Sequence, residues 1–330
     1  MDKIDFVVLW VDGNDPAWIA ERAKYLPQND KSASNPVRYR DWDLMKYWFR
    51  GVEKFAPWVN CVYFVTCGHY PEWLNLDHPK LKLIKHTDYI PEEYLPTFNS
   101  NTIELNLHRI PGLSEQFVLF NDDVFLINHV REKDFFKNGL PCETVQMGLT
   151  YSISAEEVFP HSILNNIGVL NKYFSKKKVI KQHWRKFLSS KYGVGNIRTV
   201  LLLPFVYFPG FLDTHLPASH LKSTFEEIWN IEKESLDTSC KNRFRSRTDL
   251  THWLMKNWRY CCGQVEPRSI RWGKYYTIGS DPNMLKDLRS QKYHAVCLND
   301  CDGNLDFELH KSQIQAAFEE ILPDKSSFEK

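Results

Sequence analysis

The sequence predicts an α/β fold in which helices flank a mostly parallel β-sheet. β-rich apolar runs and one helical pattern alternate along the first third of the chain, at residues 4–11, 43–55, 62–65 and 81–84. The order strand, helix, strand is typical of parallel sheets, because parallel neighbours need a crossover connection. A later apolar run, residues 117–127, carries two adjacent acidic residues. Ligands of such sheets collect at the carboxyl ends of strands, so we expect a nucleotide-binding sheet of the GT-A or Rossmann-like kind with a helical insertion.

The composition is that of a folded protein and limits its partners. The chain has 330 residues, enough for one large catalytic domain with an insertion. Its 42 Lys and Arg against 41 Asp and Glu give a net charge of +1. This balance argues against a nucleic-acid partner, because phosphate contacts require a basic excess. Aromatic residues make up 14% of the chain, and such rings suit stacking on sugars and bases.

The first apolar run ends in a strong turn signal. Residues 4–11 lead directly into Asp12 and Gly13, so we interpret the run as a strand that feeds a loop. Trp10 and Asp12 then stand at the carboxyl end of that strand, where a stacking ring and an acceptor for ribose or uracil groups are expected. The alternative is a core Trp and an Asp in a tight turn. The run is too short for a secretory signal, and no window of eighteen apolar residues predicts a membrane span.

A polar segment separates this strand from the first long helix. Residues 27–41 are rich in Pro, Asn and Ser and are interpreted as a loop. Arg38, near its end, is assigned to binding the nucleotide donor. Apolar residues then recur at helical spacing, which predicts a helix over residues 43–55 that Pro57 stops.

A second helix is predicted over residues 100–110. Ser100, Glu104 and His108 fall four apart and therefore share one helical face. The alternative is a solvated polar face with a Glu–His pair. Because the next turn leads directly into the acidic run, we expect this helix to pack beside the site.

The acidic run is the strongest single signal in the chain. Asp122 and Asp123 interrupt residues 117–127, which otherwise predict a buried strand. Two charges at the end of such a strand have a large desolvation cost unless a cation lies against them. Carboxylate oxygens suit Mg²⁺ or Mn²⁺. The alternative is a strand followed by an Asx-turn, in which Asn121 and Asp122 satisfy local backbone groups.

A basic stretch followed by an apolar one predicts an insertion. Residues 171–191 interleave eight Lys and Arg with aromatic and aliphatic residues. Residues 200–212 are mostly apolar but are broken by Pro and Gly, and they are too short to span a bilayer. We hypothesise that both touch an anionic, lipid-linked acceptor or the bilayer surface. A solvated helix and a buried loop are the alternative.

The last third of the chain adds a His, a cluster of Arg and a second acidic strand end. His215 precedes a predicted helix, and Arg243, Arg245 and Arg247 lie within five residues. Such a cluster is suited to holding phosphoryl oxygens bidentately, whereas the alternative is a charged helix N-terminus. A final predicted strand ends in Asp300, and a closing helix follows.

Three parts are expected in the chain. Residues 1–150 form the nucleotide-binding half of a catalytic domain, 151–212 form a variable insertion on the acceptor or membrane side, and 213–330 complete the domain. The eight Cys show no Cys-x-x-Cys spacing, so neither a zinc site nor a disulfide framework is predicted. We expect a reduced, cytoplasmic protein that is peripheral on the inner face of the membrane.

Several short words occur in an order that is specific to one family. They are Ile-Asp-Phe-Val-Val-Leu-Trp-Val-Asp-Gly (4–13), Arg-Tyr-Arg-Asp (38–41), Ala-Pro-Trp-Val (56–59), Pro-Thr-Phe-Asn-Ser (96–100), Leu-His-Arg-Ile-Pro-Gly-Leu-Ser (107–114), Phe-Asn-Asp-Asp (120–123), Thr-His-Leu-Pro (214–217) and Cys-Leu-Asn-Asp (297–300). Together they resemble the four conserved regions of the Stealth family. Its members are sugar-1-phosphate transferases of bacterial capsule and surface polysaccharide synthesis, and the catalytic subunit of animal GlcNAc-1-phosphotransferase is similar.

The resemblance implies a reaction and its substrates. A hexose-1-phosphate passes intact from a UDP-hexose or UDP-N-acetylhexosamine to a saccharide hydroxyl, on a lipid-linked acceptor, and UMP leaves. The enzyme class is the EC 2.7.8 type of phosphotransferase. The alternative is a metal-dependent glycosyltransferase that releases UDP, and a non-catalytic sugar binder is a third class.

The resemblance also implies roles for individual residues. Glu104, Asp123, His215, Arg245 and Asp300 match family catalytic or metal-site positions, and Asp12 and Gly13 match the nucleotide-side motif. Asp122, Asp123 and Asp300 are expected to hold Mg²⁺ or Mn²⁺, and Arg245 to clamp phosphoryl oxygens. His215 is the expected general base, with Glu104 orienting a partner or serving as the alternative base. The residues after Pro217 depart from the family pattern, so His220 is not assigned a role.

Overall fold

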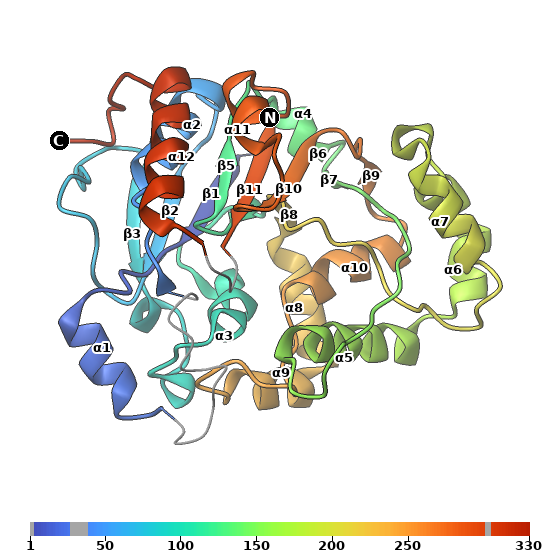
Figure 1. Cartoon of the computed structure of the whole chain (residues 1–330). Coiled ribbons are helices and arrows are strands. Elements are labelled where there is room, and N and C mark those ends of the chain that lie inside the picture. The colour runs from blue at the N-terminus through green and yellow to red at the C-terminus, as the bar shows by residue number, and fades with distance from the viewer. Residues whose placement is uncertain (1–2, 27–38, 301–304) are drawn as a thin grey trace.

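A five-stranded sheet forms the centre of the molecule (Figure 1). The computed structural model describes residues 3–26, 39–300 and 305–330. The strands lie in the order β3-β2-β1-β4-β8, with bounds β1 Ile4–Leu9, β2 Val62–Thr66, β3 Leu81–Lys85, β4 Gln116–Phe120 and β8 Ala218–Leu221. The first four are parallel, and β8 pairs antiparallel with β4. The predicted α/β class with a mostly parallel sheet is confirmed.

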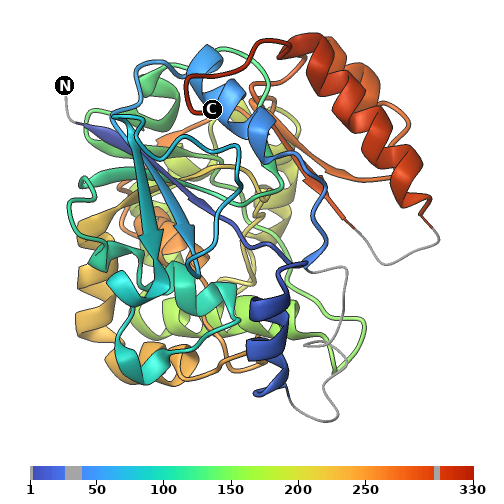
Figure 2. The ribbon, with the colours of Figure 1, turned by 90° about the vertical axis from the view of Figure 1, so that its left-hand side faces the viewer.

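Helices cover both faces of this sheet, as its apolar strands require. The α-helices of the described residues are α1 Pro16–Ala23, α2 Met45–Phe55, α3 Ser100–Leu105, α4 Glu132–Phe135, α5 Val158–Tyr173, α6 Lys176–Phe187, α7 Gly195–Leu202, α8 Lys222–Ile231, α9 Lys233–Cys240, α10 Trp253–Cys261, α11 Met284–Arg289 and α12 Phe307–Ile321, and not all of them lie on this sheet. Successive side chains of β1 point to opposite faces: Phe6 packs in the core with α2 and α12, and Val7 in the core with α8 and α10. Figure 2 shows α2 and α12 together on one side.

Two smaller sheets flank the central one. One has the order β10-β11-β5, with bounds β10 Gly273–Thr277, β11 Ala295–Asn299 and β5 Val124–Leu126. The other has the order β6-β7-β9, with bounds β6 Phe136–Lys137, β7 Leu140–Glu143 and β9 Glu266–Pro267. These strands and β8 were not expected from the sequence, β11 and β5 excepted, because most are short and gain their stability from pairing across the chain.

The acidic run is two strands, and the prediction of one buried strand over residues 117–127 is wrong. β4 ends at Phe120 in the central sheet, and β5 begins at Val124 in the sheet with β11. The chain changes sheets at residues 121–123, where the polar side chains of Asn121, Asp122 and Asp123 leave the ladder. The two carboxylates therefore sit between two sheets.

The helix predicted over residues 100–110 is shorter than expected. α3 ends at Leu105, and a 3₁₀ turn follows at Leu107–Arg109. The turn rotates His108 away from Ser100 and Glu104, and its ring stacks on Phe225 in the core at 5.8 Å between centroids. His108 therefore does not share their face.

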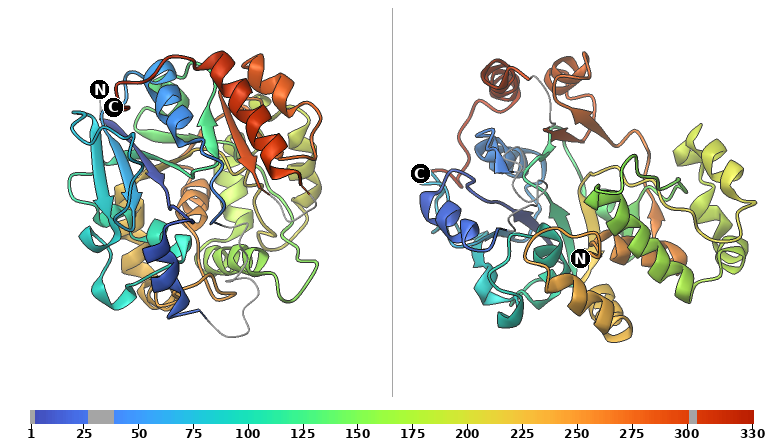
Figure 3. Two further views of the ribbon diagram at one scale, coloured as in Figure 1. Left: turned by 60° about the vertical axis from the view of Figure 1, so that its left-hand side comes forward. Right: turned by 60° about the horizontal axis from the view of Figure 1, so that its bottom comes forward.

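The segment from α5 to α7 lies at the edge of the molecule. Figures 1 and 3 show α6 and α7 next to each other, on the side remote from α1 and β3. Among the described residues, no helix has the length and apolar character needed to cross a membrane. The division of the chain into three parts stays a prediction, although β8 shows that residues after 212 complete the central sheet.

Candidate functional site

The sheet topology brings His215 to the acidic turn. β8 runs antiparallel to β4, and Ala218 pairs with Leu119 near the end of β4. The residues just before β8 therefore lie just beyond the carboxyl end of β4, which is where residues 121–123 lie. Asp213 anchors this approach through a buried ion pair of 2.5 Å with Lys256 on α10.

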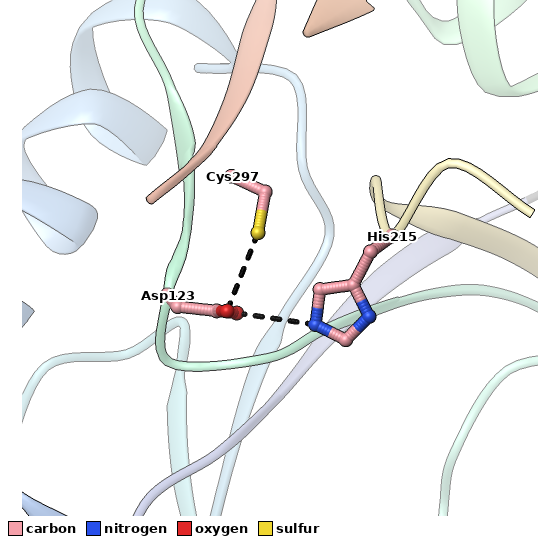
Figure 4. A group of neighbouring side chains, drawn as sticks. All are labelled: Asp123, His215 and Cys297. Carbon is pink, nitrogen blue, oxygen red and sulfur yellow. Dashed lines mark hydrogen bonds and ion pairs between the residues drawn. The ribbon is translucent and has the colours of Figure 1, made fainter. Parts of the chain in front are cut away.

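Asp123, His215 and Cys297 converge on one point (Figure 4). Their ligand atoms all lie within 4.8 Å of one another. His215 Nε2 lies 3.5 Å from Asp123 Oδ1, and the Cys297 thiol donates to Asp123 Oδ2 at 3.3 Å. Asp123 Oδ1 is buried and accepts no hydrogen bond from the part of the chain described. A buried carboxylate oxygen without a donor is a free ligand for a cation.

The backbone of His215 is held in an unusual conformation. Its φ angle is +46°, in the left-handed region that residues other than Gly rarely adopt. Such a conformation costs on the order of 1–3 kcal/mol and persists where the surrounding structure fixes it. Here the side-chain amide of Asn121 lies 3.2 Å from His215 Nε2 and the buried Asp213 precedes it. In this conformation the imidazole lies against Asp123.

Acidic neighbours decide the charge of the His215 ring. Burial alone lowers its pKa, but the carboxylates of Asp123 and Glu104 outweigh burial, and the net shift is upward. Asp123 has the larger effect because its carboxylate also contacts the ring. The ring therefore holds a proton readily, as a group that accepts one during a reaction must.

Glu104 is a buried carboxyl group whose pKa lies near neutral pH. Burial raises its pKa to about 7, with Arg245 and His215 opposing the shift. Its nearest described ion-pair partner, His252 Nε2, is 3.9 Å away, and burial keeps the pKa of His252 well below its usual value. Glu104 thus faces the cavity with a pKa that burial raises more than Arg245 and His215 lower it, as is typical of pKa-tuned acids and bases.

Arg245 enters the site from a loop that is pinned to α3. Its Nη2 donates to Ser100 Oγ at 2.7 Å. The loop itself is held by Asp249, which is fully buried and accepts from the side-chain amides of Asn99 and Asn101, each at 2.9 Å, and from Ser246 N at 2.9 Å. A buried charge with this many donors is stable and rigid.

The predicted fork of three Arg is wrong. Arg245 lines the cavity, but Arg243 donates to Leu95 O at 3.5 Å and lies over the Tyr25 ring. Arg247 donates to Ala155 O at 2.8 Å and is exposed. Alternate residues of an irregular loop point in different directions, so spacing alone did not place their guanidinium groups together.

Asp300 reaches the cavity with partners of its own. Its Oδ2 accepts from Trp42 Nε1 at 3.1 Å and lies 3.1 Å from Arg40 Nε. Asp122 and Asp300 line the same cavity as Asp123 but do not belong to the group of three ligand atoms within 4.8 Å. The expected metal role of Asp300 stays a prediction.

Only some of the residues predicted to bind the nucleotide line the cavity. Trp10 is buried against Phe64 and lines the cavity. Asp12 does not line it, and its carboxylate accepts from Asn14 N at 2.8 Å in a tight turn. Gly13 permits a close backbone approach, since a Cβ there would lie 1.8 Å from the carbonyl oxygen of Tyr39. Arg38 lies outside the described residues.

One cavity of about 460 Å³ joins these groups. Among its described lining residues, the acidic ones outnumber the Arg by five to two; the acids are Asp41, Glu104, Asp122, Asp123 and Asp300, and the Arg are Arg40 and Arg245. An anionic ligand would be repelled by this excess unless a cation came with it. Asp123 Oδ1, which accepts no hydrogen bond from the described residues, and the surplus of carboxylates both fit a divalent metal ion.

Asp122 shows the same excess of negative charge. Its side chain is exposed to the cavity, but desolvation by the surrounding protein raises its pKa to about 7. The carboxylates of Asp123 and Asp41 add to the shift. A cation between these groups would restore the ionised form.

Several residues of the site were not expected from the sequence. Arg40 and Trp42 hold Asp300, Cys297 contacts Asp123, and Asp249 fixes the Arg245 loop. Arg40 and Cys297 stand within the words quoted above, so the family pattern offered a signal for them. Asp249 had none, because Asn99 and Asn101, which tie it to the start of α3, are far away in sequence.

Family models match two segments of the chain. The model described as Stealth protein CR1, conserved region 1, matches residues 2–30, and that of Stealth protein CR2, conserved region 2, matches residues 38–143.

Curated proteins match over the whole length. A protein named capsular polysaccharide phosphotransferase WcwK, from Streptococcus pneumoniae, is 43% identical over 100% of this chain and 99% of its own. Exopolysaccharide phosphotransferase cps2G from Lactiplantibacillus plantarum is 41% identical over 99% and 96%. Receptor polysaccharide phosphotransferase WefC from Streptococcus gordonii is 41% identical over 100% and 99%.

Solved structures match only loosely. The apo crystal structure of mouse xyloside xylosyltransferase 1 covers 93% of this chain and 98% of its own, at 12% identity and a TM-score of 0.37. A superposition this loose carries no information about function.

Proposed function

This chain belongs to the Stealth family, and from that premise we propose that it is a capsular or exopolysaccharide phosphotransferase that moves a hexose-1-phosphate from a UDP-sugar to a saccharide hydroxyl. The relatives named above carry phosphotransferase names at 41–43% identity over nearly complete chains. UDP-hexoses and UDP-N-acetylhexosamines are the proposed donors, and a lipid-linked saccharide is the proposed acceptor.

The observation that carries the proposal is the meeting of Asp123, Arg245 and Asp300 in one cavity. The three come from the turn after β4, the loop after α9 and the end of β11. Phosphoryl transfer depends on positioning and on neutralising charge, and it asks little covalent chemistry of the protein. A cavity with carboxylates for a metal ion and guanidinium groups for phosphoryl oxygens suits that task.

The donor fits the cavity from the Trp10 side. Trp10 offers a ring at the carboxyl end of β1, and Arg40 and Arg245 offer guanidinium groups. A uracil or ribose against the ring leaves the diphosphate between the two Arg and the acidic turn. Arg suits non-bridging phosphoryl oxygens because its donors form a planar fork.

A divalent ion would be held by Asp123, with Asp122 beside it and Asp300 as the further predicted ligand. When bound, Mg²⁺ or Mn²⁺ supplies positive charge against the diphosphate oxygens. Mg²⁺ is commonly held by one or two carboxylates together with substrate phosphates. The donor-free oxygen of Asp123 is suited to that arrangement.

The chemical step needs one proton acceptor. The acceptor hydroxyl attacks the phosphorus next to the sugar, the bond from that phosphorus to the oxygen of UMP breaks, and the anomeric bond stays intact. His215 takes the hydroxyl proton, and Asp123 stabilises the imidazolium that forms. Glu104, whose pKa is about 7, orients the hydroxyl or serves as the alternative base.

The released nucleotide tests the proposal. The chain is incubated with a panel of UDP-sugars, a saccharide acceptor and Mg²⁺ or Mn²⁺, and the nucleotide product is identified by chromatography. UMP together with a phosphodiester product is expected. Release of UDP would instead assign the chain to metal-dependent glycosyltransferases, and no turnover of any UDP-sugar would remove the proposal.

A further inference from the structure

The segment around α6 and α7 has a charge unlike that of the rest of the chain. Residues 158–212 contain nine Lys and Arg and neither Asp nor Glu, whereas the whole chain has a net charge of +1. A segment of 55 residues without an acidic side chain creates a local positive field. Such a field attracts an anionic partner.

The same segment exposes large apolar side chains. Eight of them lie on α7 and the residues that flank it, and each is between 37% and 80% exposed: Val194, Ile197, Val200, Leu201, Leu203, Phe205, Val206 and Tyr207. Single exposed apolar residues are ordinary, but a contiguous group marks an interaction surface. We call this group, together with the exposed Lys of α6, the α6–α7 patch.

α7 is amphipathic, and its larger apolar face is exposed to solvent. Thr199 and Leu202 are its buried residues, and Thr199 Oγ1 accepts from Met147 N at 3.3 Å. Ile197, Val200 and Leu201 lie on the other side at helical spacing and face solvent. The helix is therefore anchored by its small inner face and presents its apolar face outward.

The turn after α7 is fixed by a buried lysine. Lys176 is 3% exposed, and its Nζ donates to the carbonyl oxygens of Leu202 at 2.6 Å, Leu203 at 3.0 Å and Phe205 at 2.6 Å. A cation at the carboxyl end of a helix also complements the helix dipole. Phe208 closes the turn, because its N–H donates to Asn171 Oδ1 at 2.9 Å. Phe205, Val206 and Tyr207 are thus held out in solvent by a defined structure.

Cations flank the apolar residues. Lys177, Lys178 and Lys181 are exposed on α6, and Arg198 is exposed on α7 between apolar residues. None of these four forms an ion pair with a residue that the structure describes. Figure 3 shows α6 and α7 together at the margin of the molecule. Apolar side chains between unneutralised cations complement an anionic, partly apolar surface.

We propose that the α6–α7 patch docks this chain on an anionic lipid bilayer. The apolar residues of α7 and its turn enter the boundary between headgroups and acyl chains, and the Lys of α6 contact anionic headgroups. α7 has eight residues, so it lies in the interface and does not cross the bilayer. Docking on the bilayer requires neither substrate nor catalysis, so it is independent of the proposed function.

Vesicle flotation tests the docking directly. The full chain is mixed with vesicles of phosphatidylcholine alone or of phosphatidylcholine with 30% phosphatidylglycerol, and the floated fraction is measured against lipid concentration. We expect flotation with the anionic vesicles only. Lys177→Gln, Lys178→Gln and Lys181→Gln combined should weaken it on the order of a hundredfold, since each Lys near such a surface contributes roughly a factor of five.

A second variant tests the apolar half of the patch. Leu201→Asp combined with Val206→Asp changes two exposed positions and should abolish flotation, because charged residues are costly in the acyl boundary. The matched controls are Lys85→Gln, Lys137→Gln and Lys286→Gln combined, which remove the same charge from exposed sites elsewhere, and Leu309→Asp, at an exposed apolar position on α12. Both controls should float as the wild type does.

Three results would overturn the docking proposal. One is equal flotation of the patch variants and their controls, and another is no flotation of the wild type with anionic vesicles. The third is a wild type that does not float but dimerises in sedimentation velocity, with Leu201→Asp and Val206→Asp making it monomeric; the patch would then join two copies of this chain. Circular dichroism melts of all variants show whether each is folded.

Discussion

Desolvation and neighbouring carboxylates together set the charge states of single residues in this site. The pKa values of Asp122 and Glu104 are both raised to about 7, whereas burial lowers the pKa values of His108, His220 and His252. His215 is the exception, because Asp123 and Glu104 raise its pKa in spite of burial. His215 therefore differs from these buried His residues, because its ring holds a proton more readily than theirs.

Replacing His215 should remove most of the activity. We expect His215→Ala to lower the rate of UMP release on the order of a hundredfold to ten-thousandfold, because a general base is lost. Initial rates are measured with saturating acceptor. The control is His310→Ala on α12, outside the cavity lining, which should leave the rate unchanged. Turnover near that of the wild type in His215→Ala would reject the role.

Replacing Glu104 should stabilise the protein at alkaline pH. The folded pKa, about 7, lies above the ordinary value of 4.5, so the unfolded chain ionises first as pH rises and stability is lost between these two values. The Glu104→Gln variant does not lose stability in this way, because its amide does not ionise. We expect it to gain about 2 kcal/mol more at pH 8 than at pH 5, at 1.4 kcal/mol for each unit of pKa difference.

Urea unfolding at the two pH values measures this gain. Glu72→Gln, at an exposed position, is the control and should change stability equally at both. The same Glu104→Gln variant should release UMP at least about tenfold more slowly, because a positioned acid or base typically contributes more than that. A Glu104→Gln variant that is less stable at pH 8 than the wild type would show that the carboxylate is favoured in the fold.

At the scale of elements, the site depends on loops that are tied to rigid segments. The turn after β4 is fixed because Leu298 N of β11 donates to Asp123 O at 2.8 Å. The loop before β8 is fixed by Asp213 and Lys256. The loop after α9 is fixed to the start of α3 by Asp249. His215 and Arg245 are therefore placed by neighbours that do not line the cavity, whereas Asp123 is placed by Leu298, which does.

Asp249 is predicted to position Arg245. Asp249→Asn places an amide against donors from Asn99, Asn101 and Asn242, so we expect a loss of stability on the order of 3 kcal/mol and a rate at least tenfold lower. Asp324→Asn, at an exposed position, is the control.

A double-mutant cycle separates positioning from a general loss of stability. Arg245→Lys is measured alone and together with Asp249→Asn, at temperatures where each variant is folded. If Asp249 positions Arg245, Arg245→Lys costs less rate in the Asp249→Asn background than in the wild type. Additive effects would mean that Asp249 stabilises the fold without aligning the guanidinium group.

At the scale of the whole molecule, the cavity lies where strands of two sheets and several loops meet. Residues from the first strand, the β4–β5 turn, the loop before β8 and the end of β11 share it. The acidic excess of its lining is a property of the assembled fold, because the five carboxylates are spread from residue 41 to residue 300. Folding concentrates carboxylates at one point, where the proposed divalent ion would offset their negative charge.

Metal removal should stop the reaction. We expect a chelator to abolish UMP release, and Mg²⁺ or Mn²⁺ to restore it. In the absence of nucleotide, Asp123→Asn should weaken Mn²⁺ binding at least tenfold, because Asp123 Oδ1 has no hydrogen-bond partner among the described residues. Asp300→Asn should weaken it less, since Asp300 is held by Arg40 and Trp42.

Electron paramagnetic resonance of Mn²⁺ measures both affinities directly. Asp324→Asn again serves as the control and should bind Mn²⁺ as the wild type does. Equal losses in the Asp123 and Asp300 variants would show that Asp300 leaves Arg40 to join the ion. Full activity in the presence of excess chelator would remove the metal from the proposed reaction.

The sequence alone determined the fold class, the parallel strands of the central sheet, several of the helices, and the family. Apolar periodicity predicted β1, β2, β3, α2 and α12, since each buries a continuous face whose spacing is local. The family words also contained Asp123, His215 and Asp300. The resemblance assigned Glu104 and Arg245 as well, which lie outside those words, and all five residues line the cavity. Position in a word is a local property, so it is readable without a fold.

The tertiary structure decided what these residues contact. It alone revealed that the acidic run spans two sheets, that β8 brings His215 to its turn, that only Arg245 of the three Arg faces the cavity, and that Asp300 pairs with Arg40. Each of these depends on partners far away in the sequence. Burial and charge at a point are sums over the assembled neighbours, and no local pattern contains them.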